Sequence, residues 1–444
     1  MKKYSEYKDS GVEWIGEIPV GWNVSQYKFV AEVQNGFAFK SSLFDKSEGF
    51  PILRIRDITS GRISTYYQGE FSDDYVVSKN DLLIGMDGDF NVRWWNKEDV
   101  LLNQRCCRIN NKVNADKRFL YYIIPINLQI INDLTYYTTV KHLSSGDINE
   151  AKFSLPPLSE QTQIARYLDH QTGLIDAIIE KKEKLIIKLK EQRQAIINEA
   201  VTKGLNPNAK MKDSGIEWLG EIPEHWDEVS FRFCFSLNKG LNITKANLIS
   251  NGVPCVNYGE IHSKYGFEVN PDENSLSCVS EEYLDENESA LLSKGDFVFA
   301  DTSEDIEGSG NFTHLNSETP TFAGYHTIIA RLIKEFDFRF VAYYFDSFAY
   351  RSQIQNKVKG VKVFSITNKI LKESIMLYPP VQEQFEISSY LDSKIKQSLE
   401  ITEKLKYEIK KLKSYRQSII SEAVTGKIDI RDWQPKKEII HENL

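Results

Sequence analysis

An internal repeat limits the folds open to this chain more than any other feature. Residues 8–19 read KDSGVEWIGEIP and residues 212–223 read KDSGIEWLGEIP, so ten of the twelve positions are identical. Repeated motifs in one order indicate two copies of one structural unit. The other shared pieces are PPLSEQ at 156–161 and PPVQEQ at 379–384, each with a Tyr-Leu-Asp behind it, then RQAIINEAVT at 193–202 and RQSIISEAVT at 416–425.

The spacing of the motifs separates a shared frame from two divergent fillings. The first motif returns after 204 residues and the Pro-Pro motif after 223, so the second filling is 19 residues longer. An independent domain tolerates such a length difference more easily than a packed repeat does. We therefore place the fillings at about 22–155 and 226–378.

Both fillings carry short runs of β-branched and aromatic residues bounded by Gly, Asp and Asn, which favour strands. An aromatic helical stretch follows in each. The shared order predicts one α/β (α+β) fold for both fillings. The runs are 50–56, 81–85 and 105–109 in the first filling and 253–257, 296–300 and 325–331 in the second, and the helical stretches are 118–122 and 339–344.

The segments after the two Pro-Pro motifs, 160–200 and 383–423, contain no proline and have apolar residues at helical spacing. A narrow apolar seam on a helix of about 40 residues is typical of a coiled coil. The seam residues on one seven-residue register are Leu168, Ile175, Leu189, Ile196, Leu391, Leu405, Leu412 and Ile419, with Lys182 and Ser398 as interruptions and with companions at Ile164, Ile178, Leu185, Ile387, Ile395 and Ile409.

The two helices have matching seams, so each has a partner within the chain. We expect an antiparallel pair, because the first helix must lead into the second filling before the second helix begins. Parallel packing or pairing with another chain is less economical. The predicted architecture is two globular domains separated by a long antiparallel two-helix coiled coil, with a pseudo-twofold internal repeat.

Composition limits the class of protein. The net charge of −8 gives no global positive field for a polyanion, although a local basic groove or a partner can supply phosphate contacts. Five cysteines without a Cys-x-x-Cys pair favour a reducing, cytoplasmic location. We find no apolar run behind the basic start and none long enough for a membrane span, so we expect a soluble protein.

These motifs together resemble the specificity subunits of type I restriction-modification systems, and the resemblance covers nearly the whole chain. It implies that each filling is a target recognition domain that reads one half of a bipartite site in double-stranded DNA. It implies that the helices set the spacer between the half-sites and dock modification subunits. The resulting domains are 1–155, first recognition domain; 156–205, first helix; 206–378, second recognition domain; 379–430, second helix; and 431–444, tail.

The resemblance also implies a chain that is not itself an enzyme. Methylation with S-adenosylmethionine would belong to the modification subunits, and a restriction and translocation subunit using ATP and magnesium would join them. The residues agree. The two Pro-Pro pairs lack the preceding Asn or Asp of an adenine methyltransferase motif, no phosphate-binding GxxxxGK[ST] sequence occurs, and the seven histidines show no metal-ligand spacing. We predict no cofactor and no metal in this chain.

Side chains that read bases should follow the predicted strands, with forked donors and acceptors. A solvated turn or the wet face of a strand would have a similar composition. The candidates in the first filling are Arg54, Arg56, Asp57, Asp87, Asp89, Asn91 and Arg93. Those in the second filling are Asn257, Tyr258, Asp301, Thr302, Ser303 and Asn311.

Contacts with phosphates need cations rather than sequence-specific groups. Two short stretches before the Pro-Pro motifs supply them, and the candidates are Lys141, His142, Lys359 and Lys362. The tryptophans of the repeated motif and just after it, Trp14, Trp22, Trp218 and Trp226, are more easily explained as packing anchors.

Two alternatives remain at this stage. One is the recognition subunit of a related methylating restriction system. The other is a coiled-coil scaffold that binds two proteins and no DNA, which the acidic charge favours and the motifs disfavour.

Overall fold

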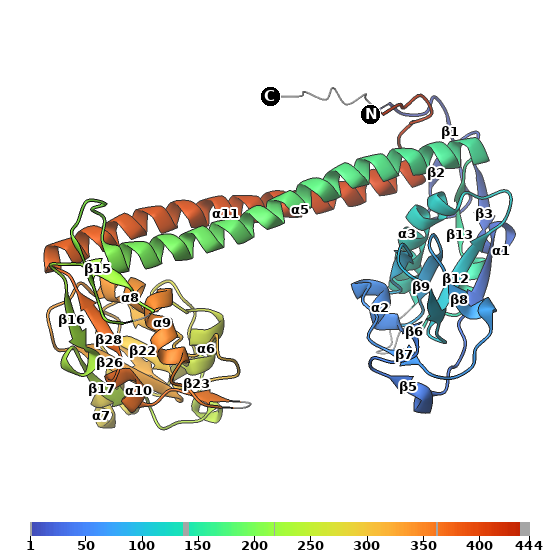
Figure 1. Ribbon diagram of the computed structural model, residues 1–444. Coiled ribbons are helices and arrows are strands. Elements are labelled where there is room, and N and C mark those ends of the chain that lie inside the picture. Colours follow the sequence, from blue (N-terminus) through green and yellow to red (C-terminus); the bar gives the residue numbers. More distant parts are fainter. Residues whose placement is uncertain (1, 136–141, 217, 361–362, 436–444) are drawn as a thin grey trace. The chain divides into compact units, whose positions relative to one another are not determined.

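The computed structural model describes residues 2–135, 142–216, 218–360 and 363–435. The chain divides into two compact units (Figure 1): the first unit is Met1–Lys182 with Lys406–Leu444, and the second unit is Glu183–Leu405. Each unit thus takes helix from both halves of the sequence. The five linear domains stay a prediction, because each compact unit combines parts of several of them.

The first unit is built around the buried strand β9 (Leu82–Gly85). It lies in a sheet of order β10-β9-β12-β4, where β10 is Val92–Trp94, β12 is Cys106–Asn111 and β4 is Ala31–Asn35. Because β9 is apolar at every position, both of its faces need cover. Leu82 and Ile84 pack in one cluster with helix α3 (Lys117–Thr135), whereas Leu83 packs on the other side with a second sheet. That sheet has the order β5-β7-β6-β11-β8: Phe44–Asp45, Tyr66–Tyr67, Phe50–Leu53, Val100–Leu102 and Val76–Val77.

The second unit repeats this plan with β22 (Phe297–Ala300) in the central place. Phe297 and Phe299 pack with the helix α8 (Phe338–Asp346), and Val298 packs toward the other sheet. The common α/β architecture predicted for the fillings is therefore confirmed. Its first sheet has the order β17-β26-β22-β24-β19: Phe235–Lys239, Thr327–Leu332, Phe297–Ala300, Phe312–Leu315 and Glu268–Val269. Its second has the order β20-β18-β25-β21: Cys278–Val279, Val253–Val256, Thr321–Ala323 and Leu291–Leu292.

Short antiparallel pairs connect these sheets to the long helices. The repeated 12-residue motif forms a hairpin in each unit, and another pair leads into each Pro-Pro motif. The hairpins are β1 (Tyr7–Asp9) with β2 (Glu17–Pro19) and β14 (Met211–Asp213) with β15 (Glu221–Pro223); the other pairs are β3 (Asn23–Gln26) with β13 (Lys152–Leu155) and β16 (Asp227–Ser230) with β28 (Ile375–Tyr378).

The two long helices are α5 (Leu158–Lys203) and α11 (Val381–Val424). In the first unit the start of α5 shares a core with the end of α11, through Leu168 and Val424. In the second unit the end of α5 shares a core with the start of α11, through Val201 and Leu391. Antiparallel packing of the pair is thus confirmed within each unit. No helix in the described part of the chain is long and apolar enough to cross a membrane.

The predicted seam residues lie at buried or half-buried positions of the two helices, and two of their companions are out of register. Ile178 and Leu185 are exposed, and their neighbours Ile179 and Ile186 face the seam instead. Runs of adjacent apolar residues leave the choice open in the sequence, and the alternating spacing of three and four decides it. Leu168, Ile175, Leu391, Leu405 and Ile419 are buried, and Leu189, Ile196 and Leu412 are half-buried.

The interruption at Lys182 has a partner across the seam. Its ammonium lies 2.6 Å from a carboxylate oxygen of Glu408 on α11. Nearby, Arg416 of α11 donates to Asp176 of α5 at 2.9 Å. Polar seam positions with specific partners fix register in coiled coils, which accounts for a lysine in an apolar stripe.

The glutamine of each Pro-Pro motif ties the recognition fold to its long helix. The amide of Gln161 donates to the Pro156 carbonyl at 2.9 Å and accepts from the backbone N–H of Asp116 at 2.9 Å. Gln384 repeats both bonds, to the Pro379 carbonyl at 2.8 Å and from the N–H of Asp337 at 3.0 Å. The motif therefore recurs because it builds the same joint twice.

The aspartate of each Tyr-Leu-Asp motif makes a second joint. Asp169 accepts from the Nε of Arg118 at 3.0 Å and from the hydroxyl of Tyr122 at 2.6 Å. Asp392 accepts in the same way from Arg339 at 3.1 Å and from the Tyr343 hydroxyl at 2.6 Å. We call these two sets the Arg-Asp-Tyr clamps.

The tryptophans divide into two groups. Trp22 and Trp226 are fully buried, and the indole N–H of Trp226 donates to Glu383 at 3.1 Å, so the packing role predicted for them is confirmed. Trp218 is partly buried against the core of the second unit. Trp14 is 49% exposed, and the prediction of an anchor there is wrong, because its hairpin turns that side chain outward.

Candidate nucleic-acid interface

Four of the six candidate base-reading residues of the second unit line one cavity of about 680 Å³. The segment after β22 supplies Thr302 and Ser303, and the helix α6 (Tyr258–Ser263) supplies Tyr258. Asn311, just before β24, also lines the cavity. The structure thus brings together four side chains that the sequence names from three separate places.

Hydrogen bonds hold the wall of this cavity in one arrangement. His262, one turn along α6, donates through Nε2 to the carbonyl oxygen of Thr302 at 2.8 Å. The other ring nitrogen, Nδ1, then accepts from the amide of Asn311 at 2.8 Å. The guanidinium of Arg351, on α9 (Phe348–Gln355), donates to the oxygen of the same amide. This network orients the Asn311 side chain, and sequence reasoning missed both His262 and Arg351.

An exposed ring edge lies beside the cavity. The rings of Tyr258 and His326 meet at 5.4 Å in an edge-to-face arrangement, and His326 is exposed. Asp301 lies 3.2 Å from the Nδ1 of His326. The candidate Asp301 therefore stands next to the cavity with a histidine as its partner.

The corresponding loop of the first unit follows β9. Asp87 pairs with His142 as an isolated antiparallel bridge, and its carboxylate lies 2.7 Å from Nδ1 of that histidine and 3.5 Å from Arg105. The structure thus brings together Asp87, His142 and Arg105, a cation that the sequence analysis missed. Asp89 and Asn91 lie exposed on the same loop.

The pairing of Asp87 with His142 has a direct counterpart in the second unit. There β23 (Thr302–Ser303) pairs with β27 (Phe364–Ser365), and Thr302 lies opposite Ser365. Position for position, an acid and a histidine in one unit are replaced by a threonine and a serine in the other. The two loops therefore share a backbone framework and present different functional groups.

The group around Arg54 is not the strand that the sequence predicts. The strand ends at Leu53, and Ile55–Ser60 form helix α2, because the carboxylate of Asp57 accepts from the Arg54 N–H at 2.9 Å in a capping box. Asp57 is buried, and burial raises its pKa, while Arg56 is exposed.

Asn257 is the N-cap residue of α6, the place that Arg54 takes in α2. It is buried, and its backbone N–H donates to Glu260 at 3.0 Å in a capping box. Arg93 donates to the carbonyls of Ile58 at 2.7 Å and Thr59 at 3.0 Å, at the end of α2. We leave Asp57, Arg93 and Asn257 out of the proposed base-reading set, since each is committed to a helix end.

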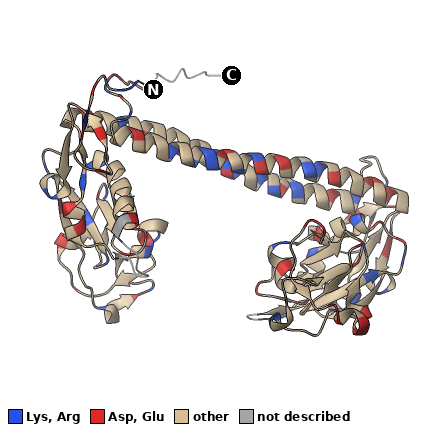
Figure 2. Cartoon of the chain, turned by 180° about the vertical axis from the view of Figure 1, so that it is seen from behind, with Lys and Arg blue, Asp and Glu red and all other residues tan. Residues whose placement is uncertain are grey.

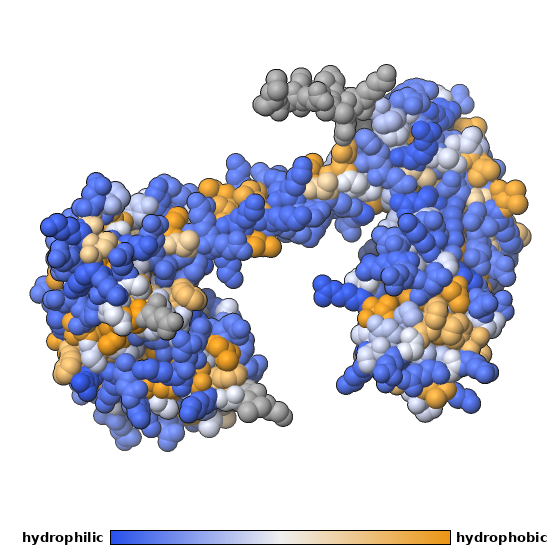
Figure 3. All heavy atoms as spheres, in the orientation of Figure 1, coloured by the Kyte–Doolittle hydropathy of each residue, from blue (hydrophilic) through white to orange (hydrophobic). Residues whose placement is uncertain are grey.

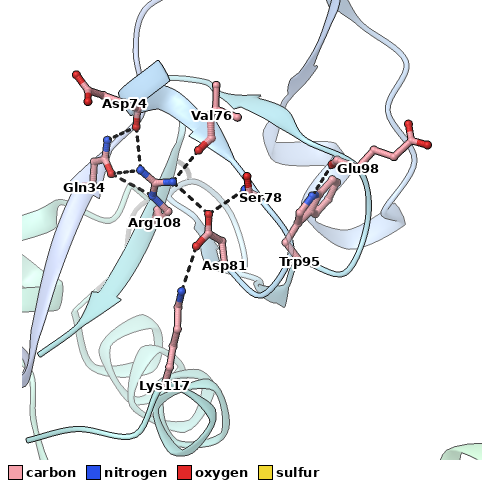
Figure 4. A network of polar contacts seen from close by, with 9 residues as sticks. All are labelled: Gln34, Asp74, Val76, Ser78, Asp81, Trp95, Glu98, Arg108 and Lys117. Carbon is pink, nitrogen blue, oxygen red and sulfur yellow. Dashed lines mark hydrogen bonds and ion pairs between the residues drawn. The ribbon is translucent and has the colours of Figure 1, made fainter. Parts of the chain in front are cut away.

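A polar network joins the turn before β9 to β12 and to the start of α3 (Figure 4). The guanidinium of Arg108 on β12 donates to Asp81 at 3.1 Å and to the carbonyl of Val76 at 2.7 Å. Lys117 contacts the second oxygen of Asp81 at 3.1 Å. Burial alone would raise the pKa of Asp81, but the Ser78 N–H and the two cations hold it below its usual value.

The second unit repeats this network with fewer cations. Arg331 on β26 donates to Asp296 at 3.0 Å and also to the Leu291 carbonyl. Burial raises the pKa of Asp296, because a single guanidinium and one backbone N–H do not offset it. The recurrence marks this pair as part of the framework rather than of the variable surface.

The phosphate candidates are only partly described. Lys141 and Lys362 lie outside the described residues. Lys359 is exposed after α9, and His142 is half exposed beside Asp87. Figure 2 shows acidic and basic residues interspersed along both long helices.

In the part of the chain that the structure describes, no group of three His, Cys, Asp or Glu side chains is placed to hold a metal ion. All five cysteines are buried, and burial raises the pKa of Cys106 to about 12. Buried thiols of high pKa are poor nucleophiles.

Comparison with known proteins gives consistent results. The family model described as "Type I restriction modification DNA specificity domain" matches residues 19–189 and again residues 223–411. The type I restriction enzyme EcoBI specificity subunit of Escherichia coli is 30% identical over 411 residues, which cover 90% of this chain and 84% of that protein. The MjaVIII specificity subunit of Methanocaldococcus jannaschii is 24% identical, covering 94% of this chain and 95% of that protein.

A solved structure described as "Structural basis underlying complex assembly and conformational transition of the type I R-M system" has a similar fold. Its TM-score is 0.67 at 16% sequence identity, and the alignment covers 93% of this chain and 99% of the other. The two family matches start at Pro19 and Pro223, the same point of the internal repeat.

Proposed function

Because the chain belongs to the type I restriction modification DNA specificity family and is a specificity subunit of such a system, we propose that its two units read the two halves of a split DNA sequence. The observation that carries this proposal is a contrast within each unit. The joints to the long helices are the same in both units, down to the Arg-Asp-Tyr clamps. The loops after β9 and β22 occupy the same place in the fold and differ in chemistry.

In the second unit, the groups that would meet base edges are Thr302, Tyr258 and Asn311. An asparagine amide pairs with the N6 and N7 positions of adenine, and hydroxyls accept or donate according to the base. The His262 and Arg351 contacts pre-orient the Asn311 amide, so less rotational freedom is lost on binding.

In the first unit, the corresponding groups are Asp87, Asp89, Asn91 and Arg105. Carboxylates accept from the N4 amino group of cytosine, and arginine donates to the O6 and N7 of guanine. The first half-site is therefore expected to contain G·C pairs where these side chains reach, and it differs from the second half-site. Arg56 is a further donor on the exposed side of α2.

Contacts to phosphates are proposed for Lys359, His142, Lys141 and Lys362. Their number is small for a chain of negative net charge. We propose that the modification subunits supply the remaining cations, which agrees with a recognition subunit that binds DNA as part of a complex.

Methyl transfer and DNA cleavage are proposed to take place in partner subunits, with S-adenosylmethionine in the modification subunits and ATP with magnesium in the restriction subunit. The long helices offer a surface for docking, because large apolar side chains on them are exposed (Figure 3). These side chains are Leu174, Ile178, Ile187, Leu399, Ile401 and Tyr407.

The test is to replace residues 226–378 by the corresponding segment of a relative with another specificity. The hybrid is expressed with its modification subunits, and the methylated sites are read by methylome sequencing. We expect one half of the site to change while the other half and the gap are kept. A change in both halves would contradict the division of labour, and a complex that methylates no split site would favour the scaffold alternative.

A further inference from the structure

In the first unit, the chain covers one of its own aromatic rings with its tail. The ring of Trp433 meets the ring of Tyr167 at 5.2 Å, nearly at right angles, and Tyr167 is 4% exposed. The amide of Gln163 donates to the carbonyl oxygens of Ile430 at 3.3 Å and Trp433 at 2.6 Å. The segment 428–433 is thereby held against the start of α5.

In the second unit, the equivalent tyrosine is uncovered. Tyr390 stands at the same step of the repeat as Tyr167, and it is 38% exposed. It lines a cavity of about 480 Å³, which we call the Tyr390 groove. After α5 the chain leads into β14 instead of folding back over the ring. The other walls of the groove include Ile196, Ala200, Lys203, Gly204, Leu205 and Met211.

The polar edge of the groove differs from that of the covered site. Gln163 stands four residues before Tyr167 and donates to the covering segment, whereas Glu386, at the same step before Tyr390, accepts from Gln382 at 3.0 Å and is not part of the groove wall. The wall carries the carboxylates of Glu199 and Glu221 instead. A carboxylate cannot donate a hydrogen bond, so an occupant that bonds to them must itself donate.

We propose that the Tyr390 groove seats an aromatic side chain of a modification subunit, with a lysine or arginine next to that side chain bonding to Glu199. The proposal rests on the proposed function, because it takes the modification subunit as the partner. The size, the aromatic wall and the acidic edge of the groove together define the occupant. The first unit fills the equivalent place with Trp433, so the groove makes the two ends of the repeated frame unequal toward a partner.

The test is photo-crosslinking in the assembled complex. p-Benzoylphenylalanine is introduced at Leu205, which lines the groove and is exposed, and the full chain is co-purified with its modification subunits. The matched control carries the same probe at Phe385, which is exposed on the same helix as Tyr390 and is not part of the groove wall. Adducts are mapped by mass spectrometry.

We expect the Leu205 probe, and not the Phe385 probe, to react with one segment of the modification subunit that has Trp, Tyr or Phe next to Lys or Arg. Tyr390→Ala should weaken assembly by about 30-fold, the usual effect of truncating an aromatic anchor, and Phe385→Ala should not. Glu199→Lys should reduce the Leu205 adduct by repelling the cation.

Four results overturn the proposal alone: no Leu205 adduct in a complex that methylates a split site, an adduct on a segment without an aromatic residue, an adduct on DNA or on the restriction subunit, or equal effects of the two alanine variants. If the chain does not co-purify with modification subunits, the proposed function fails, and this proposal fails with it.

Discussion

The Arg-Asp-Tyr clamps allow a matched comparison of the two units. Asp169→Ala removes the carboxylate that accepts from Arg118 and Tyr122, and Asp392→Ala does the same for Arg339 and Tyr343. The two sites differ in their remaining partners. In the first unit, the Tyr122 hydroxyl also lies 3.3 Å from the Thr172 hydroxyl, and Arg118 lies over the Trp94 ring at 4.3 Å. Arg339 also donates to Glu268, on the strand β19 that belongs to the second unit.

The magnitude follows from the number of bonds and their exposure. Hydrogen bonds to charged groups contribute about 1.5–3 kcal/mol each when shielded from water. Asp169 is 39% exposed, so solvent screening reduces the set to roughly 1–2 kcal/mol in total. Arg339 keeps Glu268 after the substitution in the second unit, and we expect about half of that loss there.

Hydrogen exchange followed by mass spectrometry measures the effect locally. In Asp169→Ala, amides in the first turns of α3 should exchange about 5–30-fold faster, because local opening becomes easier by that free energy. In Asp392→Ala, α8 should speed up less, and each variant should leave the other unit's helix unchanged. Equal acceleration in both units, or none in α3, would refute the reasoning that Glu268 compensates in one clamp and that Arg118 depends on Asp169.

Three further predictions use other contacts. The His314 ring and the Arg339 guanidinium hold the pKa of Glu268 at about 2. A carboxylate with a lowered pKa stabilises the fold fully above its unfolded pKa, and this stability is lost as the pH falls toward the folded pKa, so we expect β19 to lose exchange protection between about pH 4.5 and pH 2. Glu268→Gln should abolish that pH dependence. Gly61→Ala should destabilise the first unit by more than Gly11→Ala in urea denaturation. Both glycines have positive φ, which costs an alanine about 1 kcal/mol. A Cβ at Gly61 would lie 2.1 Å from the Arg93 guanidinium, whereas a Cβ at Gly11 would meet open space. Inserting four residues at the same level of α5 and α11 should lengthen the unread gap between the half-sites by about two base pairs. The reason is that about 6 Å of added helix corresponds to about two base-pair steps of 3.4 Å in DNA. Methylome sequencing reads the gap, and a change in the bases of either half-site would contradict the prediction.

Several features of the fold were open to prediction because they rest on local or periodic signals. The repeat predicts two similar units, since duplicated motifs build the same joints. The seven-residue register predicts Leu168 and Leu391 in the seam, because burial on a helix follows from its period. Where two apolar residues adjoin, as at Ile178 and Ile179, the period leaves a choice that only packing against the other helix resolves.

The candidate site depended both on the sequence and on the tertiary structure. The sequence by itself determined that Thr302 and Asn311 follow or precede strands, because loops after buried runs are where polar side chains gather. It could not determine that His262 and Arg351 reach the same cavity, since they stand 40 or more residues away and have no motif of their own. Only the tertiary structure decided that Asp57 and Asn257 cap helices, that Arg93 closes a helix end, and that Tyr390 is left open where Tyr167 is covered. The physical reason is that periodicity and motifs act along the chain, whereas the partner of a hydrogen bond is chosen by which distant segments fold into contact.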